Sequence, residues 1–273
     1  MKMKRILMNS LLSASSLLAL NACGNQDTST SEQKITNGKV IANSDYPSVV
    51  MLYDAKMGAI CTGTFVTETT VIAAAHCTMS GEIDSQGNVD GSLLIVNVID
   101  LAAGEVQAIA ESTSMVRNPL WEKNGKEVNK WDLSLITFPK GTAKAVSDFA
   151  TAKPKANDAL TIVGYGLNQS KNLFDGSSAG IKRVGANTVT AVSDGFIQFK
   201  GQSATTTADG TKSSASGGDS GGPLFIGGKL AGVTSGGGAD WFGLGSSSTS
   251  LYVDLSSAES RTFLSAHSDL LAK

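Results

Sequence analysis

Three short motifs that follow one another in a fixed order constrain this chain more than any other feature of its sequence. Ala-Ala-Ala-His-Cys contains His76, Trp-Asp-Leu-Ser-Leu-Ile contains Asp132, and Gly-Asp-Ser-Gly-Gly-Pro contains Ser220. One such motif alone would only weakly indicate a functional site. Together they supply a base, a carboxylate and a hydroxyl nucleophile, so the fold has to bring three distant segments to one place.

The three residue types form a known chemical unit. A serine hydroxyl is a poor nucleophile at neutral pH and needs a base within hydrogen-bond reach. His76 is the natural base, because the ordinary pKa of histidine lies near physiological pH. Asp132 would accept the other ring N–H, fix the tautomer and stabilise the imidazolium. We therefore expect His76, Asp132 and Ser220 to form a catalytic triad.

The pattern of short apolar runs between turn residues predicts a mainly β protein. Charged residues make up only 17% of the chain, and its 30 glycines accompany many Ser, Thr and Asn. The C-terminal segment is predicted to be a helix, because apolar residues from Phe263 to Leu271 repeat at helical spacing. Ser256 with Glu259 fits a capping box at the start of this helix. Strands are expected near 49–53, 61–66, 71–74, 93–101, 133–138, 160–163, 196–199, 224–226, 229–233 and 251–255.

The first 34 residues are predicted to lie outside the folded domain. Residues 1–22 have a basic start and a short apolar stretch, which is typical of an export signal. They end in Leu-Asn-Ala-Cys, which resembles a bacterial lipobox and makes Cys23 the lipidation site; an ordinary signal peptide is the alternative. Residues 23–34 are polar and predict a flexible tether. We expect a protein exported from a bacterial cell and anchored to a membrane through Cys23.

Cysteine and charge usage exclude several classes of site. If Cys23 carries lipid, Cys61 and Cys77 remain as a pair, which in an exported protein suggests one disulfide. Two buried thiols in a cytosolic protein are the alternative, and the export signal disfavours it. The chain has only two histidines and no Cys-x-x-Cys pair, so no metal site is expected. Its net charge of −2, with no basic cluster beyond the first five residues, argues against nucleic-acid binding.

The chain resembles the chymotrypsin-like (trypsin-fold) serine proteases over nearly all of residues 35–273. Besides the three motifs, the resemblance rests on Tyr-Pro at 46–47, Val-Gly-Tyr-Gly at 163–166, Gly-Val-Thr-Ser-Gly-Gly at 232–237 and the Cys61…Cys77 pair. It implies two six-stranded antiparallel β-barrels with a C-terminal helix and an active site between them. We expect a monomeric serine endopeptidase that acts on proteins or peptides without a cofactor.

The resemblance also implies how the site is assembled. The backbone N–H groups of Gly218 and Ser220 would form the oxyanion hole. Lys34-Ile35 looks like the family's activation site, although Thr-Asn follows where the family has Val-Gly. Cleavage there would free the amino group of Ile35 to pair with Asp219 and order the oxyanion loop. It would also release the domain from the membrane.

The resemblance places the substrate pocket at Ser214, Ser235, Gly237 and Ser250. Ser214 stands where trypsin-like members carry an acid, so no carboxylate is expected there to bind Lys or Arg. Small wall residues leave room for a large apolar or aromatic side chain; a preference for small side chains is the alternative. Such a pocket would cleave poorly after Lys34, so a separate protease is expected to activate this one.

Two other functions are compatible with part of the same pattern. Ser220, Asp254 and His267 follow the order of an α/β-hydrolase esterase, but Ser220 lacks the buried strand and following helix that its elbow requires. A protease fold without activity, used as a binding module, typically loses a triad member, and none is missing here.

The acidic loop with Glu82, Asp84, Asn88 and Asp90 lacks the EF-hand spacing and is expected to be solvated.

Overall fold

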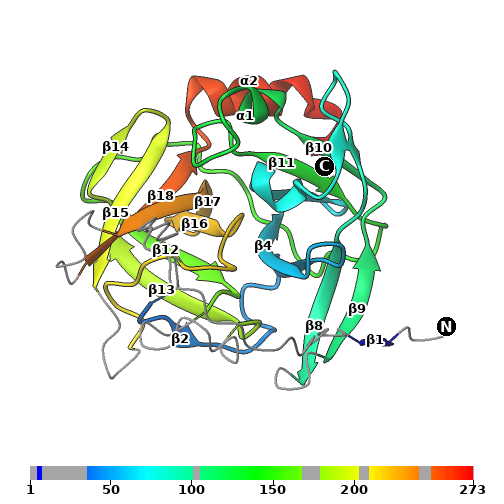
Figure 1. Ribbon diagram of the computed structural model, residues 1–273. Helices are drawn as coiled ribbons and strands as arrows, with labels where there is room; N and C mark the ends of the chain where they lie inside the picture. Colours follow the sequence, from blue (N-terminus) through cyan, green and yellow to red (C-terminus); the bar gives the residue numbers. More distant parts are fainter. Residues whose placement is uncertain are drawn as a thin grey trace, which may run out of the picture.

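In the computed structural model the described residues form two large antiparallel β-sheets that lie side by side, with short helices at one side of the pair (Figure 1), and one small two-stranded sheet. It describes residues 5–7, 36–100, 105–167, 179–202, 209–239 and 247–272. Cys23, Lys34 and Ile35 lie outside these residues. The predicted lipidation at Cys23 and cleavage at Lys34-Ile35 therefore concern parts of the chain that the structure does not describe. No helix among the described residues is long and apolar enough to cross a membrane.

The first sheet closes into a barrel because β9, near one end of the strand order, and β10, at the other end, are almost continuous in sequence. Its order is β1-β9-β8-β3-β4-β5-β11-β10, and only residues 112 and 113 separate β9 from β10. Counting β9 and β10 as one bent strand gives the expected six-stranded first barrel, and β1 (Arg5–Leu7) adds an edge strand beside β9. The others are β3 (Val49–Asp54), β4 (Ala59–Phe65), β5 (Thr70–Ala73), β8 (Leu94–Asp100), β9 (Glu105–Glu111), β10 (Ser114–Arg117) and β11 (Ser134–Thr137).

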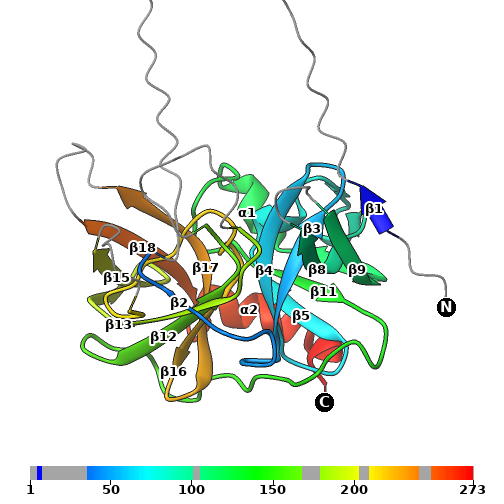
Figure 2. The same ribbon diagram turned by 90° about the horizontal axis from the view of Figure 1, so that it is seen from below.

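The second sheet forms the second barrel, seen opposite the first in Figure 2. Its order is β14-β15-β18-β17-β16-β12-β13-β2. The Asn187 amide on β13 donates to the Lys200 carbonyl on β15 over 3.0 Å, which links the two ends of its six main strands. The strands are β2 (Lys39–Val40), β12 (Ala159–Gly164), β13 (Arg183–Thr188), β14 (Ala191–Ser193), β15 (Phe196–Gln202), β16 (Pro223–Ile226), β17 (Lys229–Ala239) and β18 (Ser247–Asp254).

Buried β-branched and aromatic side chains explain why these segments are strands. Such residues suit a pleated surface that is covered on one face. Ile72 and Leu135 fill the first barrel, and Phe199 and Tyr252 fill the second, each at 1% exposure or less. Val233 of the second barrel packs into the same cluster as the first-barrel residues. Phe199 and Tyr252 belong to a separate core cluster of the second barrel, so each barrel has its own core and the two meet around Val233. The all-β fold with a C-terminal helix is confirmed.

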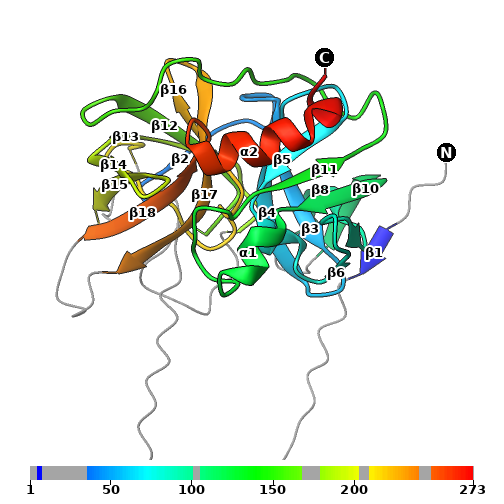
Figure 3. The same cartoon turned by 90° about the horizontal axis from the view of Figure 1, so that it is seen from above.

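The C-terminal helix α2 (Ala258–Ala266) and the turn η3 (Ser268–Leu271) follow the second barrel but also bind the first (Figure 3). The Thr70 hydroxyl on β5 donates to the Leu270 carbonyl over 2.6 Å. The predicted capping box is wrong, because the Ser256 hydroxyl bonds Asp254 instead. Ser257 caps the helix by accepting from the Ser260 N–H.

The structure contains the predicted disulfide between Cys61 on β4 and Cys77 on η1 (Ala75–Thr78). It closes a loop with a sequence separation of 16. We expect the double substitution Cys61→Ala, Cys77→Ala to lower the free energy of unfolding by about 3 kcal/mol, because the unfolded chain regains the entropy of that loop. Urea unfolding measures this, with reduced wild type as the control. Equal unfolding midpoints for all forms would contradict the expectation.

Candidate active site

His76 and Asp132 meet because β5 and β11 run side by side. Ala73 pairs with Ser134 in that antiparallel register, so the residues just after β5 face those just before β11. His76 lies in η1, and its Nδ1 is 2.8 Å from Asp132 Oδ2. The backbone N–H of His76 also donates to Asp132 Oδ1 over 3.0 Å. Local strand pairing thus holds the ring and the carboxylate in one orientation.

The second barrel supplies a third hydrogen bond to Asp132. The Ser235 hydroxyl on β17 donates to Asp132 Oδ2 over 2.6 Å. Asp132 is fully buried, and a buried carboxylate needs such donors to remain charged. Ser235 is also an expected residue of the substrate pocket, and that expectation stays a prediction beside this hydrogen bond to Asp132. Nothing in the sequence around Ser235 signals this contact, because it depends on how the barrels pack.

The environment of His76 raises its pKa above the ordinary 6.5. Burial of the ring acts to lower the pKa, because it disfavours the charged form. The charge of Asp132 and its hydrogen bond act in the opposite direction and outweigh burial. The imidazole is therefore a stronger base than a free histidine, as proton transfer from a hydroxyl requires.

Ser220 lies on the loop before β16, where both barrels hold its backbone. The Thr62 N–H on β4 donates to the Ser220 carbonyl over 2.8 Å. Cys77 Sγ lies 3.6 Å from the same oxygen. The neighbouring Gly221 N–H donates to the Thr234 carbonyl of β17 over 2.8 Å. A side chain at Gly221 would come within 2.4 Å of the Thr62 carbonyl, so only glycine fits.

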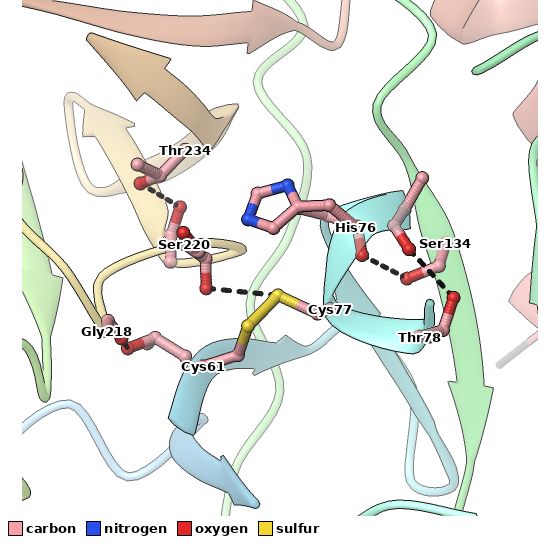
Figure 4. Close-up of a disulfide and its surroundings, with 12 residues drawn as sticks. Cys61, His76, Cys77, Thr78, Ser134, Gly218, Ser220 and Thr234 are labelled. Atoms are coloured by element: carbon pink, nitrogen blue, oxygen red, sulfur yellow. Dashed lines mark hydrogen bonds between the residues drawn. A yellow bond between two sulfur atoms is a disulfide. The ribbon is translucent and has the colours of Figure 1, made fainter. Parts of the chain in front are cut away.

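Figure 4 shows the His76 imidazole extending from η1 toward Ser220, with the disulfide alongside. Among the hydrogen bonds of the described residues, none joins the two side chains. Catalytic hydrogen bonds are often long without substrate and tighten when it binds, so this geometry suits a resting site. The structure thus brings all three triad candidates to one place.

The Thr62 side chain adds a contact that sequence reasoning missed. Its hydroxyl donates to the Gly218 carbonyl over 2.9 Å and accepts from the Tyr165 N–H over 3.1 Å. Gly218 has φ +92°, a backbone conformation that favours glycine. Thr62 therefore links β4 of the first barrel to the loop that carries the nucleophile.

The N–H groups of Gly218 and Ser220 are the candidate oxyanion donors. In the part of the chain that the structure describes, neither donates a hydrogen bond to another group. The intervening Asp219 N–H is used, because it donates to the Ser216 carbonyl over 2.9 Å. Two unused donors, one on the nucleophile itself and one two residues before it, are what an oxyanion requires.

Asp219 is buried at 1% exposure directly beside the nucleophile. Its carboxylate accepts the N–H groups of Gly166 and Ser216, each over 2.8 Å. The buried Arg183 guanidinium lies near enough that the Asp219 charge acts to raise its pKa, although burial dominates and lowers it. Asp219 thus orders the backbone of the Ser220 loop.

The remaining pocket candidates come together in the second barrel. Ser214 is fully buried, and its backbone forms a bridge with Thr36, the first described residue after Ile35. The Ser250 hydroxyl on β18 accepts the Ala215 N–H over 3.0 Å. Gly237 pairs with Ser250 across β17 and β18. The side chains gathered here carry hydroxyls, not charges.

The other candidate residues have local structural roles. The sulfur atoms of Cys61 and Cys77, which lie close to His76, are joined in the disulfide and do not serve as thiolate ligands. Asp84 accepts the N–H groups of Gln86 and Asn88, so its oxygens hold the turn between β6 (Glu82–Ile83) and β7 (Val89–Asp90).

The esterase alternative gains no support from the geometry. The His267 ring packs on Phe263, and its Nδ1 hydrogen-bonds the Phe263 carbonyl. Asp254 bonds Ser256 at the start of the terminal helix. Both residues therefore organise the end of the chain.

The family described as Trypsin matches residues 35–253 of this chain. The matched span includes His76, Asp132 and Ser220 and ends just before α2. No curated protein matches the chain.

Proposed function

The chain belongs to the trypsin family of chymotrypsin-like serine proteases, and from that premise we propose that it is an endopeptidase that forms an acyl-enzyme on Ser220. The observation that carries the proposal is the Asp132–His76 pair, held by hydrogen bonds of 2.8 and 3.0 Å, with its ring extending toward Ser220 (Figure 4). Protein or peptide substrates follow from the family.

The geometry supports a two-step reaction. His76 Nε2 takes the proton of the Ser220 hydroxyl as its oxygen attacks the peptide carbonyl. Asp132 holds the proton on Nδ1 and stabilises the imidazolium. The N–H groups of Gly218 and Ser220 receive the oxyanion. His76 then protonates the leaving amine, and water hydrolyses the resulting ester by the same transfers in reverse.

Peptide hydrolysis by the cleaved, purified domain tests this assignment. We expect the highest kcat/KM for peptides with a large apolar or aromatic residue before the scissile bond, because Ser214, Gly237 and Ser250 bring no charge to the pocket. Matched peptides with Lys or Ala at that position are the comparison. A preference for Lys would overturn the proposed pocket, and a preference for Ala would favour the small-residue alternative.

The dependence of activity on pH gives a further prediction. Since Asp132 raises the pKa of His76 above 6.5, we expect kcat/KM to fall about tenfold per unit as the pH drops below that raised pKa. Protonated His76 cannot accept the Ser220 proton. Initial rates between about pH 5 and 9 measure this fall of kcat/KM on the acidic side of the profile. A flat profile over that range would contradict His76 as the base.

Activation by cleavage at Lys34-Ile35 is the second part of the proposal. Two observations support it: Thr36 is paired with Ser214 of the pocket, and the buried Asp219 carboxylate lies beside Ser220. A new amino group at Ile35 would pair with Asp219 and complete the oxyanion loop. A separate protease makes the cut, since the proposed pocket rejects Lys34. Self-activation of purified precursor, or equal activity before and after the cut, would overturn this part.

Lipid anchoring at Cys23 is the third part. Cys61 and Cys77 are joined to each other, so the two remaining cysteines cannot hold a lipid. The same cut would then free the domain from the membrane of a bacterial cell. Membrane fractionation of wild type and Cys23→Ala tests this. We expect the wild type in the membrane fraction until cleavage, and a Cys23→Ala protein that fractionates identically would overturn the anchor.

A further inference from the structure

The loop that carries Ser220 is rich in glycine, so hydrogen bonds have to order its backbone. Residues 217, 218, 221 and 222 are all glycines, and a glycine gives the backbone more conformational freedom than any other residue. The two candidate oxyanion donors, the N–H groups of Gly218 and Ser220, are effective only if their direction is fixed before the reaction. The contacts that hold these two residues therefore determine how well the oxyanion is stabilised.

Thr62 on β4 binds the carbonyl groups of both donor residues. Its backbone N–H donates to the Ser220 carbonyl over 2.8 Å, and its hydroxyl donates to the Gly218 carbonyl over 2.9 Å. The hydroxyl also accepts the Tyr165 N–H over 3.1 Å, which leaves its own hydrogen for Gly218. One residue of the first barrel thus holds the loop at both oxyanion donors.

The other backbone hydrogen bonds of this loop come from the second half of the chain. The carbonyls of Gly217 and Asp219 share peptide groups with the two donors, and they accept backbone N–H groups over 3.0 and 2.8 Å. The peptide group between the donors is held at its N–H by the Ser216 carbonyl and at its carbonyl by the Thr62 hydroxyl. Among these bonds, those from Thr62 fix the loop relative to the first barrel.

The strand segment around Thr62 is also tied to the catalytic base. Cys61 precedes Thr62, and its disulfide joins it to Cys77, which follows His76 (Figure 4). Thr62 is fully buried, and a side chain at Gly222 would come within 3.2 Å of its methyl group. Close packing of the methyl group leaves the hydroxyl in one orientation. Thr62 therefore holds the oxyanion donors in place relative to the segment that carries the base.

We propose that Thr62 is a positioning residue of the hydrolysis, whose hydroxyl holds Gly218 so that its N–H points at the oxyanion of the transition state. The proposal rests on the proposed endopeptidase function and adds to it a residue outside the three sequence motifs. The hydroxyl is bound to the loop backbone and acts through Gly218. Since the oxyanion forms only in the transition state, loss of the hydroxyl should lower kcat and leave KM nearly unchanged.

Thr62→Val isolates the hydroxyl, because valine keeps the branched shape and the backbone N–H. We expect kcat of the cleaved enzyme to fall about 10- to 100-fold, less than the 10²- to 10³-fold typical for deletion of an oxyanion donor. Thr64→Val is the matched control on the same strand. The Thr64 hydroxyl is buried without a hydrogen-bond partner among the described residues, so this variant should match the wild type. Thr62→Ser restores the hydroxyl and should recover most of the activity.

A pair of inhibitors separates positioning from a general loss of structure. A peptide aldehyde forms a hemiacetal: the Ser220 oxygen bonds the aldehyde carbon, and the serine proton passes through His76 to the aldehyde oxygen in the hole. The matching peptide alcohol fills the same pocket but has no carbonyl for the serine to attack. We expect Thr62→Val to weaken the aldehyde by the factor that it takes from kcat/KM, and to leave the affinity for the alcohol unchanged.

Wild-type kcat and aldehyde affinity in folded Thr62→Val would overturn the positioning role, and so would equal losses in Thr62→Val and Thr64→Val. If Thr62→Val does not fold, Thr62→Ala removes the hydroxyl without placing a methyl group against the Gly218 carbonyl, and the same losses are expected. Absence of peptide hydrolysis by the cleaved wild type would instead overturn the proposed function.

Discussion

Ser220→Ala is expected to lower kcat for peptide hydrolysis by about 10⁶-fold, the scale on which serine proteases lose activity without their nucleophile. The variant keeps the His76–Asp132 pair, whose hydrogen bonds do not involve Ser220. Its fold should also survive, because Thr62 holds the backbone of Ser220 and not its side chain. The loss should therefore appear in kcat with little change in substrate binding.

The assay compares cleaved Ser220→Ala with cleaved wild type and with Ser265→Ala. Ser265 is exposed on α2, and its substitution removes the same hydroxyl at a distance from the site. We expect Ser265→Ala to match the wild type. If Ser220→Ala retained more than about a hundredth of wild-type activity, the hydrolysis would not depend on the proposed nucleophile.

Asp132→Asn is expected to lower kcat by about 10⁴-fold with the geometry of the site preserved. The amide can still accept the His76 backbone N–H, but its NH₂ group would donate to Nδ1. The ring proton would then sit on Nε2, which could no longer accept the proton of Ser220. The fully buried position of Asp132 leaves no room for water to take over its role.

Ser235→Ala is the matched control for that experiment. It removes one of the three donors to Asp132 but leaves the carboxylate in place. We expect a loss of about tenfold, which is typical for one hydrogen bond to a charged group. An Asp132→Asn loss no larger than that of Ser235→Ala would show that the tautomer of His76 does not limit the reaction.

The three triad candidates and the disulfide could be predicted because each sits in a local motif with few interpretations. The strand segments could be predicted as well, since their apolar runs need only a covered pleated surface. The convergence of His76 and Asp132 then follows from one strand register, between Ala73 and Ser134. Predictions of this kind succeed where short sequence patterns determine the geometry.

Two of the missed contacts depend on packing between distant segments, and the third is a local choice between hydrogen-bond partners. Thr62 contacts Gly218 and Ser220 only because β4 of one barrel lies against a loop of the other. The Ser235 hydroxyl reaches Asp132 across the barrel interface, a contact that its expected place in the pocket does not predict. The N-cap of α2 is Ser257 and not the predicted Ser256, because the Ser256 hydroxyl donates to Asp254. No short sequence motif signals any of these three contacts.

Labelling with a fluorophosphonate, followed by mass-spectrometric mapping of the modified residue, tests the central claim most directly. The purified precursor is labelled before and after cleavage between Lys34 and Ile35, beside Ser220→Ala. The account predicts an adduct on Ser220 that appears only after cleavage and is absent from the variant. Labelling before cleavage would keep the nucleophile but contradict the activation switch. Folded, correctly cleaved protein that takes no label on Ser220 would contradict the protease assignment and favour a binding role for the fold.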